Sequence, residues 1–164
     1  MISEDSLDDA GLRHVYGRAM AAQRTAGELL ARTVAAAEVG VVVVIDIDSM
    51  GAVNARHGTG VGDRLLHAVE AGLRGELRGF GEVARMAGDQ FVVVVPGRCS
   101  GSEVVADVLR AVRGAGIRSR WGRPVRVTAC AGFAGWGQNQ DPGTVLAAAG
   151  AELSIAKAFS PRAR

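Results

Sequence analysis

Residues 39–48 read VGVVVVIDID, the most informative segment of the chain for predicting its fold. Its apolar part is short, continuous and β-branched, which is typical of a central strand buried on both faces. The run ends at two aspartates, Asp46 and Asp48. Because side chains alternate along a strand, these two would share one face if the strand continued through them. We therefore expect carboxylates at the carboxyl end of a central strand.

The segments around this strand alternate between helical and extended patterns. The spacing of apolar residues predicts helices over residues 7–39, 63–77, 102–112 (with Ser102 as N-cap) and 144–159. Further strands are expected over residues 82–86, 91–95 and 123–133, the last with 117–121 as its pairing candidate. Residues 87–90, AGDQ, form a hairpin turn with a glycine available for positive φ. This order predicts an α+β (α/β) sandwich, a mixed central sheet flanked by helices.

Composition excludes several classes of protein. The chain has 164 residues, 48% hydrophobic and 22% charged, as expected for one compact domain. A net charge of +2 and 4% aromatic residues argue against a nucleic-acid partner. The apolar run before Asp46 is too short to cross a membrane, and the first residues are acidic where a secretory signal would be basic. We expect a cytoplasmic protein without a membrane or nucleic-acid partner.

Acidic residues in two turns are the candidates for a cation-binding site. Asp46 and Asp48 follow the central strand, and Asp89 lies in the hairpin turn. If these strands are neighbours, their carboxylates converge at one sheet edge, which suits a hard cation such as Mg²⁺ and its phosphate ligands. The alternative is that the aspartates only cap helices and turns.

Several motifs stand in one register: IDIDSMGAVN at 45–54, GVGD at 60–63 and RMAGDQF at 85–91. Together they resemble the GGDEF family of diguanylate cyclases, where D-x-D-x-F-K-x-x-N-D…G-H-x-x-G-D precedes a hairpin whose turn reads GG(D/E)EF. Ala156-Lys157 is similar to the family's Y-x-A-K segment. The resemblance covers about residues 39–162 and implies a nucleotidyl cyclase-like fold with the signature on the hairpin turn. We expect a helical segment over residues 1–38, packed on a degenerate GGDEF domain over 39–164.

The family joins two GTP molecules into cyclic di-GMP across two domains that meet face to face. The resemblance implies that Asp46 and Asp89 bind Mg²⁺ (or Mn²⁺), with the Ile47 carbonyl as a further ligand. The positions it implies for catalysis are Asp46, Asp89 and Gln90. The positions it implies for nucleotide binding are Asn54, Asp63, Gly88, Lys157 and Arg162. Alternatively, Asn54 and Asp63 are caps, and Lys157, the only lysine, is a solvated cation in a helix's last turn.

The departures from the family pattern lie at positions that bind the metal ion and the phosphates in that family. Gln90 replaces a glutamate, which removes one negative charge and a potential base. Gly51 stands where the family has a phosphate-binding lysine, and Thr59 replaces a histidine. Arg162 lies one position later than the pattern requires. The family's R-x-x-D inhibition site reads RGFG at 78–81, so feedback binding of cyclic di-GMP there is not expected.

Three functions remain open from the sequence. The preferred hypothesis is a GTP-binding, nucleotide-responsive regulatory module with a divalent cation and with weak or lost cyclase activity. The alternative is an active diguanylate cyclase, which needs a homodimer through the nucleotide face. The third is an interaction scaffold that binds only a protein partner.

Overall fold

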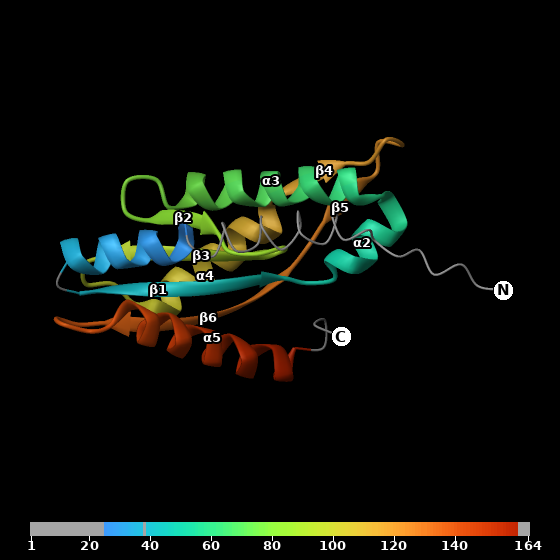
Figure 1. The fold of residues 1–164 in the computed structure, drawn as a ribbon. Coiled ribbons are helices and arrows are strands. Elements are labelled where there is room, and N and C mark those ends of the chain that lie inside the picture. The colour runs from blue at the N-terminus through green and yellow to red at the C-terminus, as the bar shows by residue number, and fades with distance from the viewer. Residues whose placement is uncertain (1–24, 38, 161–164) are drawn as a thin grey trace, which may run out of the picture.

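The computed structural model describes residues 25–37 and 39–160, and its core is an antiparallel sheet covered by helices on both faces (Figure 1). A four-stranded sheet has the order β2-β3-β1-β6, and β4 pairs with β5 separately. The strands are β1 (Gly40–Ile47), β2 (Glu82–Arg85), β3 (Gln90–Pro96), β4 (Gly116–Arg118), β5 (Pro124–Arg126) and β6 (Ala129–Trp136). The helices are one over residues 25–36, α2 (Met50–His57), α3 (Thr59–Glu76), α4 (Gly101–Gly114) and α5 (Pro142–Phe159).

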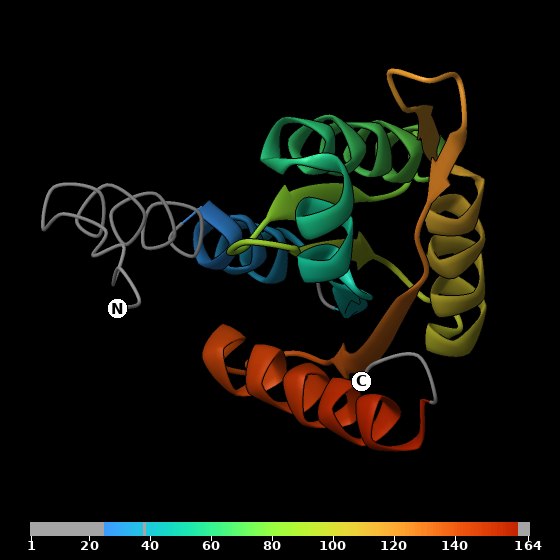
Figure 2. The same ribbon diagram turned by 90° about the vertical axis from the view of Figure 1, so that its right-hand side faces the viewer.

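The predicted central strand is confirmed as β1, which is buried along all eight of its residues. Its odd-numbered residues, such as Val43 and Ile45, belong to one core with α3 and α4. Val42 and Val44 belong to a second core with α5 and the helix over residues 25–36. Figure 2 shows these two helical layers on opposite sides of the sheet. Two separate cores explain why the strand sequence is continuously apolar rather than alternating.

The predicted α+β fold is confirmed, but where a mixed sheet was expected, every pairing in the four-stranded sheet is antiparallel. β1 and β2 run in the same direction, but β3 lies between them and pairs with both. The β2–β3 hairpin is therefore folded back so that its second strand inserts beside β1. This insertion is what brings the hairpin turn to the carboxyl end of β1.

Elements differ from the predicted ones at several places: α2 was not predicted, and α3 begins at Thr59 rather than at residue 63. Ser102 is not the N-cap of α4; Ser100 is, and its Oγ accepts a hydrogen bond from the Glu103 N–H at 3.4 Å. The strand predicted over residues 123–133 is two strands, because the chain leaves the β4–β5 pair and joins β1 only at β6. α5 begins at Pro142, since Asp141 caps it by accepting from the Thr144 N–H at 2.8 Å.

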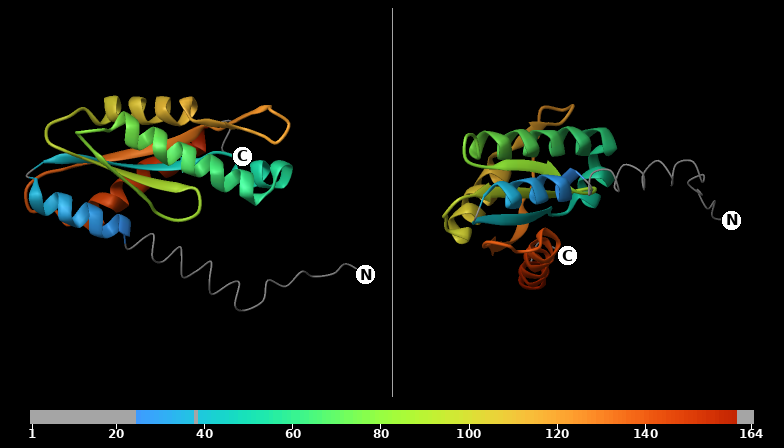
Figure 3. Two further views of the ribbon diagram at one scale, coloured as in Figure 1. Left: turned by 90° about the horizontal axis from the view of Figure 1, so that it is seen from above. Right: turned by 60° about the vertical axis from the view of Figure 1, so that its left-hand side comes forward.

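The part of the N-terminal segment that the structure describes packs on the sheet. Ala26, Leu29 and Leu30 are buried in the core that contains α5. Figure 3 shows this helix at the opposite end of the molecule from α2 and the β4–β5 hairpin. The predicted domain boundary at residue 38 stays a prediction.

Candidate functional site

The hairpin turn over residues 87–90 has the predicted geometry. Gly88 has φ of +56°, a conformation that glycine adopts without the strain of a side chain. The Gln90 N–H donates to the Ala87 carbonyl at 2.9 Å, and the Met86 N–H donates to the Gln90 carbonyl at 2.8 Å. Ala87 is not among the described residues with positive φ, so alanine is accepted there without strain.

This turn is anchored on the carboxyl end of β1, and the anchoring brings the two acidic segments together. The Ile47 N–H donates to the Asp89 carbonyl at 3.1 Å, and Asp46 stands directly opposite Gln90 in the sheet. Burial first, and then the negative charge of Asp46, raise the pKa of Asp89 above its usual value. The expected convergence of Asp46 and Asp89 is confirmed.

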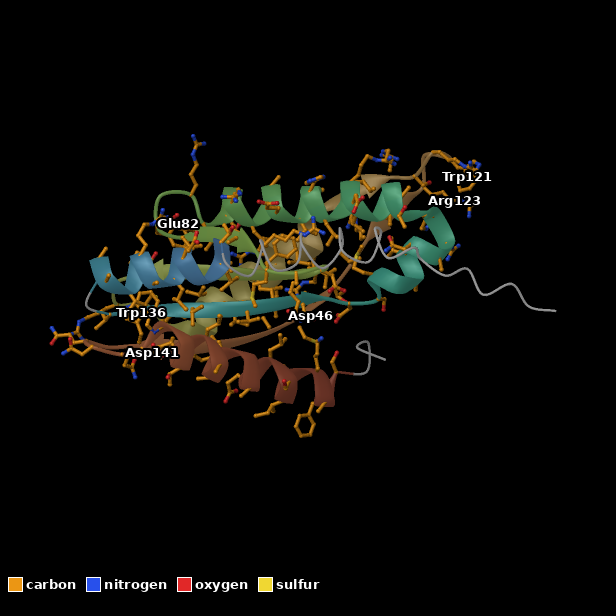
Figure 4. All side chains as sticks on the ribbon, viewed as in Figure 1. Asp46, Glu82, Trp121, Arg123, Trp136 and Asp141 are labelled. Atoms are coloured by element: carbon orange, nitrogen blue, oxygen red, sulfur yellow. The ribbon has the colours of Figure 1, made fainter. Side chains whose placement is uncertain are left out.

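Asp46 is held by two side chains from other elements. Its Oδ2 accepts a hydrogen bond from Gln90 Nε2 at 2.8 Å and forms an ion pair with Lys157 Nζ at 2.7 Å. Figure 4 shows Asp46 on β1. The residue is only 8% exposed, so its charge is largely removed from water. A buried carboxylate needs such partners. Three predicted site residues, from β1, β3 and α5, thus meet at one oxygen atom.

A hollow of about 310 Å³ opens beside this cluster, between α2, α3 and the hairpin turn. Its volume lies at the lower end of the range for small-molecule sites. The hollow brings together four residues that the sequence analysis assigns to a nucleotide or metal. Its lining consists of Met50, Gly51, Asn54, Asp63, Leu66, Arg85, Gly88 and Asp89.

Arg85 is a site residue to which the sequence analysis gives no role. Its Nε and Nη2 donate to the Gly88 carbonyl at 2.9 and 2.6 Å, so the guanidinium braces the turn and faces the hollow. The sequence could have indicated this role, because Arg85 lies at the end of β2 directly before the turn. A long cationic side chain there can donate to the turn carbonyls.

Asn54 lies against α3 because residue 62 is a glycine. A Cβ at Gly62 would collide with Asn54 Oδ1. This oxygen is buried and has no hydrogen-bond partner among the residues that the structure describes. An unpaired buried oxygen at the wall of a hollow favours a polar ligand there. The GVGD segment therefore supplies Asp63 and also the space that Asn54 occupies.

Asp48 does not join the site that Asp46 forms. Its Oδ2 accepts from Thr128 Oγ1 at 2.6 Å, and its Oδ1 accepts from Cys130 Sγ at 3.6 Å. Its backbone N–H donates to the Thr128 carbonyl at 2.8 Å. Asp48 thus fastens the end of β1 to β6, and burial first raises the pKa of the Cys130 thiol beside it.

The donors at the site fit a hard divalent cation. Among the described residues no three His, Cys, Asp or Glu side chains are grouped to hold a metal by themselves. Mg²⁺, however, is commonly bound by one or two carboxylates together with water and substrate phosphates. Asp46, Asp89 and the Ile47 carbonyl are oxygen donors of this kind. Arg162, the remaining predicted residue, lies outside the described part of the chain.

A membrane-spanning helix is not found in the described part of the chain, where every helix is too short or too polar for that role.

Comparison with known proteins gives a consistent result. A family model described as diguanylate cyclase, GGDEF domain, matches residues 11–160 and so begins upstream of the motifs. Diguanylate cyclase TpbB of Pseudomonas aeruginosa is 34% identical over 119 residues, which are 71% of this chain and 27% of TpbB. The chain therefore spans about a quarter of the length of the curated relatives it matches.

Two solved structures have a similar fold. The GGDEF domain of TpbB (YfiN) from Pseudomonas aeruginosa superposes with a TM-score of 0.70 at 29% identity, over 89% of this chain and 86% of that chain. The GGDEF domain of DgcB from Caulobacter crescentus, solved in complex with c-di-GMP, has a TM-score of 0.75 at 21% identity. That match covers 87% of each chain.

Proposed function

This chain belongs to the GGDEF domain family, and from that premise we propose that it binds GTP with a divalent cation as a nucleotide-responsive regulatory module. In this proposal cyclase activity is weak or lost. The module acts in the cytoplasm, where GTP is available, and passes its nucleotide state to a homodimer partner or to another protein.

The contact between Gln90 and Asp46 is the observation that supports weak or lost cyclase activity. An acid at position 90 would add a second negative charge beside Asp46 and draw a cation between the two. The Gln90 amide instead donates to Asp46 Oδ2, and Lys157 pairs with the same oxygen. This carboxylate is therefore balanced by the chain's own groups, which weakens its attraction for a metal ion. Position 90 also offers no base, because an amide does not take up a proton at neutral pH.

The hollow beside the hairpin turn supports binding of a guanine nucleotide. Asn54 and Asp63 line its wall, and a carboxylate at Asp63 would accept the N–H groups of a guanine edge. Adenine lacks that pair of donors, so the same wall disfavours it. A divalent cation held by Asp46 and Asp89, when bound, would neutralise part of the phosphate charge. Lys157 would contact the terminal phosphates.

The absence of a lysine side chain at Gly51 is consistent with slow synthesis of cyclic di-GMP. This residue lines the hollow, and no other group lies within 4 Å of the place where a side chain would begin. Phosphoryl transfer depends on positioning and on charge around the phosphates. A site without a lysine at position 51 and without an acid at position 90 keeps groups that recognise the base and lacks groups that act on the phosphate.

Isothermal titration calorimetry with GTP and ATP, each with Mg²⁺, tests the binding proposal. We expect GTP to bind at least about tenfold more tightly than ATP, and Asp63→Asn to remove that preference. Glu152→Gln, which neutralises an exposed carboxylate on α5, is the matched control and should bind like the unaltered chain. Equal binding of both nucleotides would contradict the proposed guanine preference. Binding of neither would contradict the proposal as a whole and favour an interaction scaffold.

Incubation with GTP and Mg²⁺ or Mn²⁺, followed by chromatographic separation of the nucleotides, tests the cyclase alternative. We expect little or no cyclic di-GMP. Product that disappears in the Asp46→Ala variant would establish an active cyclase instead. Light scattering in the same buffers shows whether GTP brings two copies together, as the alternative requires.

A further inference from the structure

A second hollow lies at the end of the molecule where the β4–β5 hairpin meets α2. Figures 1 and 3 show this hairpin and α2 at the same end of the fold. Two adjoining spaces of about 530 and 220 Å³ share Arg56, His57, Ser119 and Trp121. None of these residues lines the hollow beside the AGDQ turn. The two hollows thus use different residues of α2.

The wall of this second hollow is strongly positive. Arg56 comes from α2 and Arg123 from the hairpin, and Arg120 joins them in the smaller space. Within the described residues neither Arg56 nor Arg123 forms an ion pair with a carboxylate. Residues 115–127, which contain this hairpin, include four arginines and no aspartate or glutamate. A chain of nearly balanced charge therefore concentrates unpaired guanidinium groups here, and guanidinium groups are the preferred partners of phosphate oxygens.

Two residues that line the same space each have a buried polar atom without a partner in the described part of the chain. Ser119 is 6% exposed, and its Oγ has no hydrogen-bond partner among the described residues. His57 Nδ1 is likewise buried and unpaired within that part of the chain. Burying such a group without a partner is unfavourable, so each one calls for an explanation. Ser119 and His57 both line the hollow, and a ligand with polar oxygens would satisfy them there.

An exposed aromatic ring stands at the rim. Figure 4 shows Trp121 near Arg123 at this end of the molecule. Trp121 is 63% exposed, and the Arg120 guanidinium lies 3.9 Å from the centroid of its ring. The hairpin tip that carries both residues is a defined turn, closed by the Gly122 N–H donating to the Ser119 carbonyl at 2.9 Å. Indole rings and guanidinium planes are the surfaces on which nucleobases stack. The ring is therefore presented beside the arginines on a fixed support.

We propose that this hollow between α2 and the β4–β5 hairpin is a second nucleotide-binding site, with the phosphates on Arg56 and Arg123 and the base stacked on Trp121. Ser119 Oγ and His57 Nδ1 bind polar oxygens of the same ligand. The site is separate from the Asn54–Asp63 hollow, and its existence does not depend on the function proposed above.

Tryptophan fluorescence of the full chain tests this site with ATP as the probe. The chain has two tryptophans, and Trp136 is only 4% exposed, so quenching by a stacked base reports on Trp121. ATP is chosen because the other hollow is expected to prefer guanine. Arg56→Ala and Arg123→Ala should each weaken ATP binding by at least about tenfold. Arg98→Ala, which removes an exposed arginine in the β3–α4 loop, is the matched control and should leave binding unchanged.

Further ligands and variants decide between the outcomes. We expect adenosine, which lacks phosphate, and pyrophosphate, which lacks a base, each to bind at least about tenfold more weakly than ATP. Asp63→Asn should leave the ATP response unchanged, which separates this site from the proposed guanine site. The proposal is overturned if ATP does not quench Trp121, if pyrophosphate binds as tightly as ATP, or if neither arginine variant changes the affinity. Circular dichroism verifies the fold of each variant, and a fall in ATP affinity of the unaltered chain with added salt gives an independent check.

Discussion

Replacing Gln90 by glutamate should convert a stabilising contact into a repulsive one. The Gln90 amide now donates to Asp46 Oδ2 at 2.8 Å, and a glutamate there would set two carboxylates against each other. Two unit charges about 4 Å apart repel by about 4 kcal/mol at an effective dielectric constant near 20. Lys157, at 2.7 Å from Asp46 Oδ2, offsets part of this repulsion. We expect Gln90→Glu to lower the free energy of unfolding by about 2 kcal/mol without metal, or Tm by about 4–8 °C.

Divalent cations should reverse this loss, because a cation between two carboxylates favours the folded state. At a Mg²⁺ concentration about 100-fold above Kd, binding adds about 2.7 kcal/mol. Thermal unfolding of Gln90→Glu and of the unaltered chain, with EDTA and across a Mg²⁺ series, measures both effects. Gln138→Glu adds the same charge at an exposed position of the β6–α5 loop and serves as the matched control.

A Gln90→Glu chain that is as stable as the original in EDTA and no more responsive to Mg²⁺ would contradict this prediction. Such a result would mean that position 90 and Asp46 do not share a site in solution. If the variant behaves as expected, the cyclic di-GMP assay has a second use. If Gln90→Glu makes cyclic di-GMP and the unaltered chain does not, position 90 is what limits activity. If Gln90→Glu also makes none, Gly51 or a missing dimer contact limits activity as well.

Three further changes test other contacts of the fold and the site. Gly62→Ala should displace Asn54 and weaken GTP binding in calorimetry, whereas Gly60→Ala, in open space on the same helix, should leave binding unchanged and add about 0.5–1 kcal/mol of stability. Gly132→Ala should cost about 3 kcal/mol or more in denaturant unfolding, because its Cβ would meet the α5 backbone, while Gly137→Ala meets nothing within 4 Å and should be nearly neutral. Burial and then the charge of Asp46 raise the pKa of Asp89, so the folded state holds that proton more tightly and loses stability as pH rises through the raised pKa. Asp89→Asn should therefore have the higher Tm at pH 7, with the difference shrinking as the pH is lowered to about 4, and equal melting curves at both pH values would contradict this account.

The fold could be predicted from the sequence where a pattern was local and strong. The β1 run, the hairpin over residues 82–95 and the apolar stripe of α3 all lie where periodicity indicated. The division of residues 123–133 into two strands could not be read locally. It depends on which neighbours each half finds, since Val125 pairs with β4 and Cys130 with β1. The sequence of a strand does not by itself determine which other strand it pairs with.

The candidate site was predictable in its members and less so in their contacts. The motifs placed Asp46, Asp89, Asn54 and Asp63 around one end of the sheet, and the structure brings them there. The ion pair between Lys157 and Asp46 joins segments more than a hundred residues apart, so no local pattern could indicate it. The second hollow was missed because its arginines are spread over α2 and the hairpin, and a net charge of +2 conceals a cluster.

The glutamine at position 90 changes what holds the site together. With an acid there, two carboxylates beside one another would need a cation, and the end of β1 and the hairpin turn would depend on metal for their mutual contact. With the amide, one neutral donor and Lys157 satisfy Asp46, and α5, β1 and β3 are joined without a metal ion. Sites that act on substrates commonly carry such repulsion at a cost in stability, and relieving it stabilises the fold while it removes activity. The hollow proposed to hold the nucleotide lies beside this contact rather than within it. The two parts of the proposal, binding of the base and loss of cyclase activity, are therefore compatible in one chain.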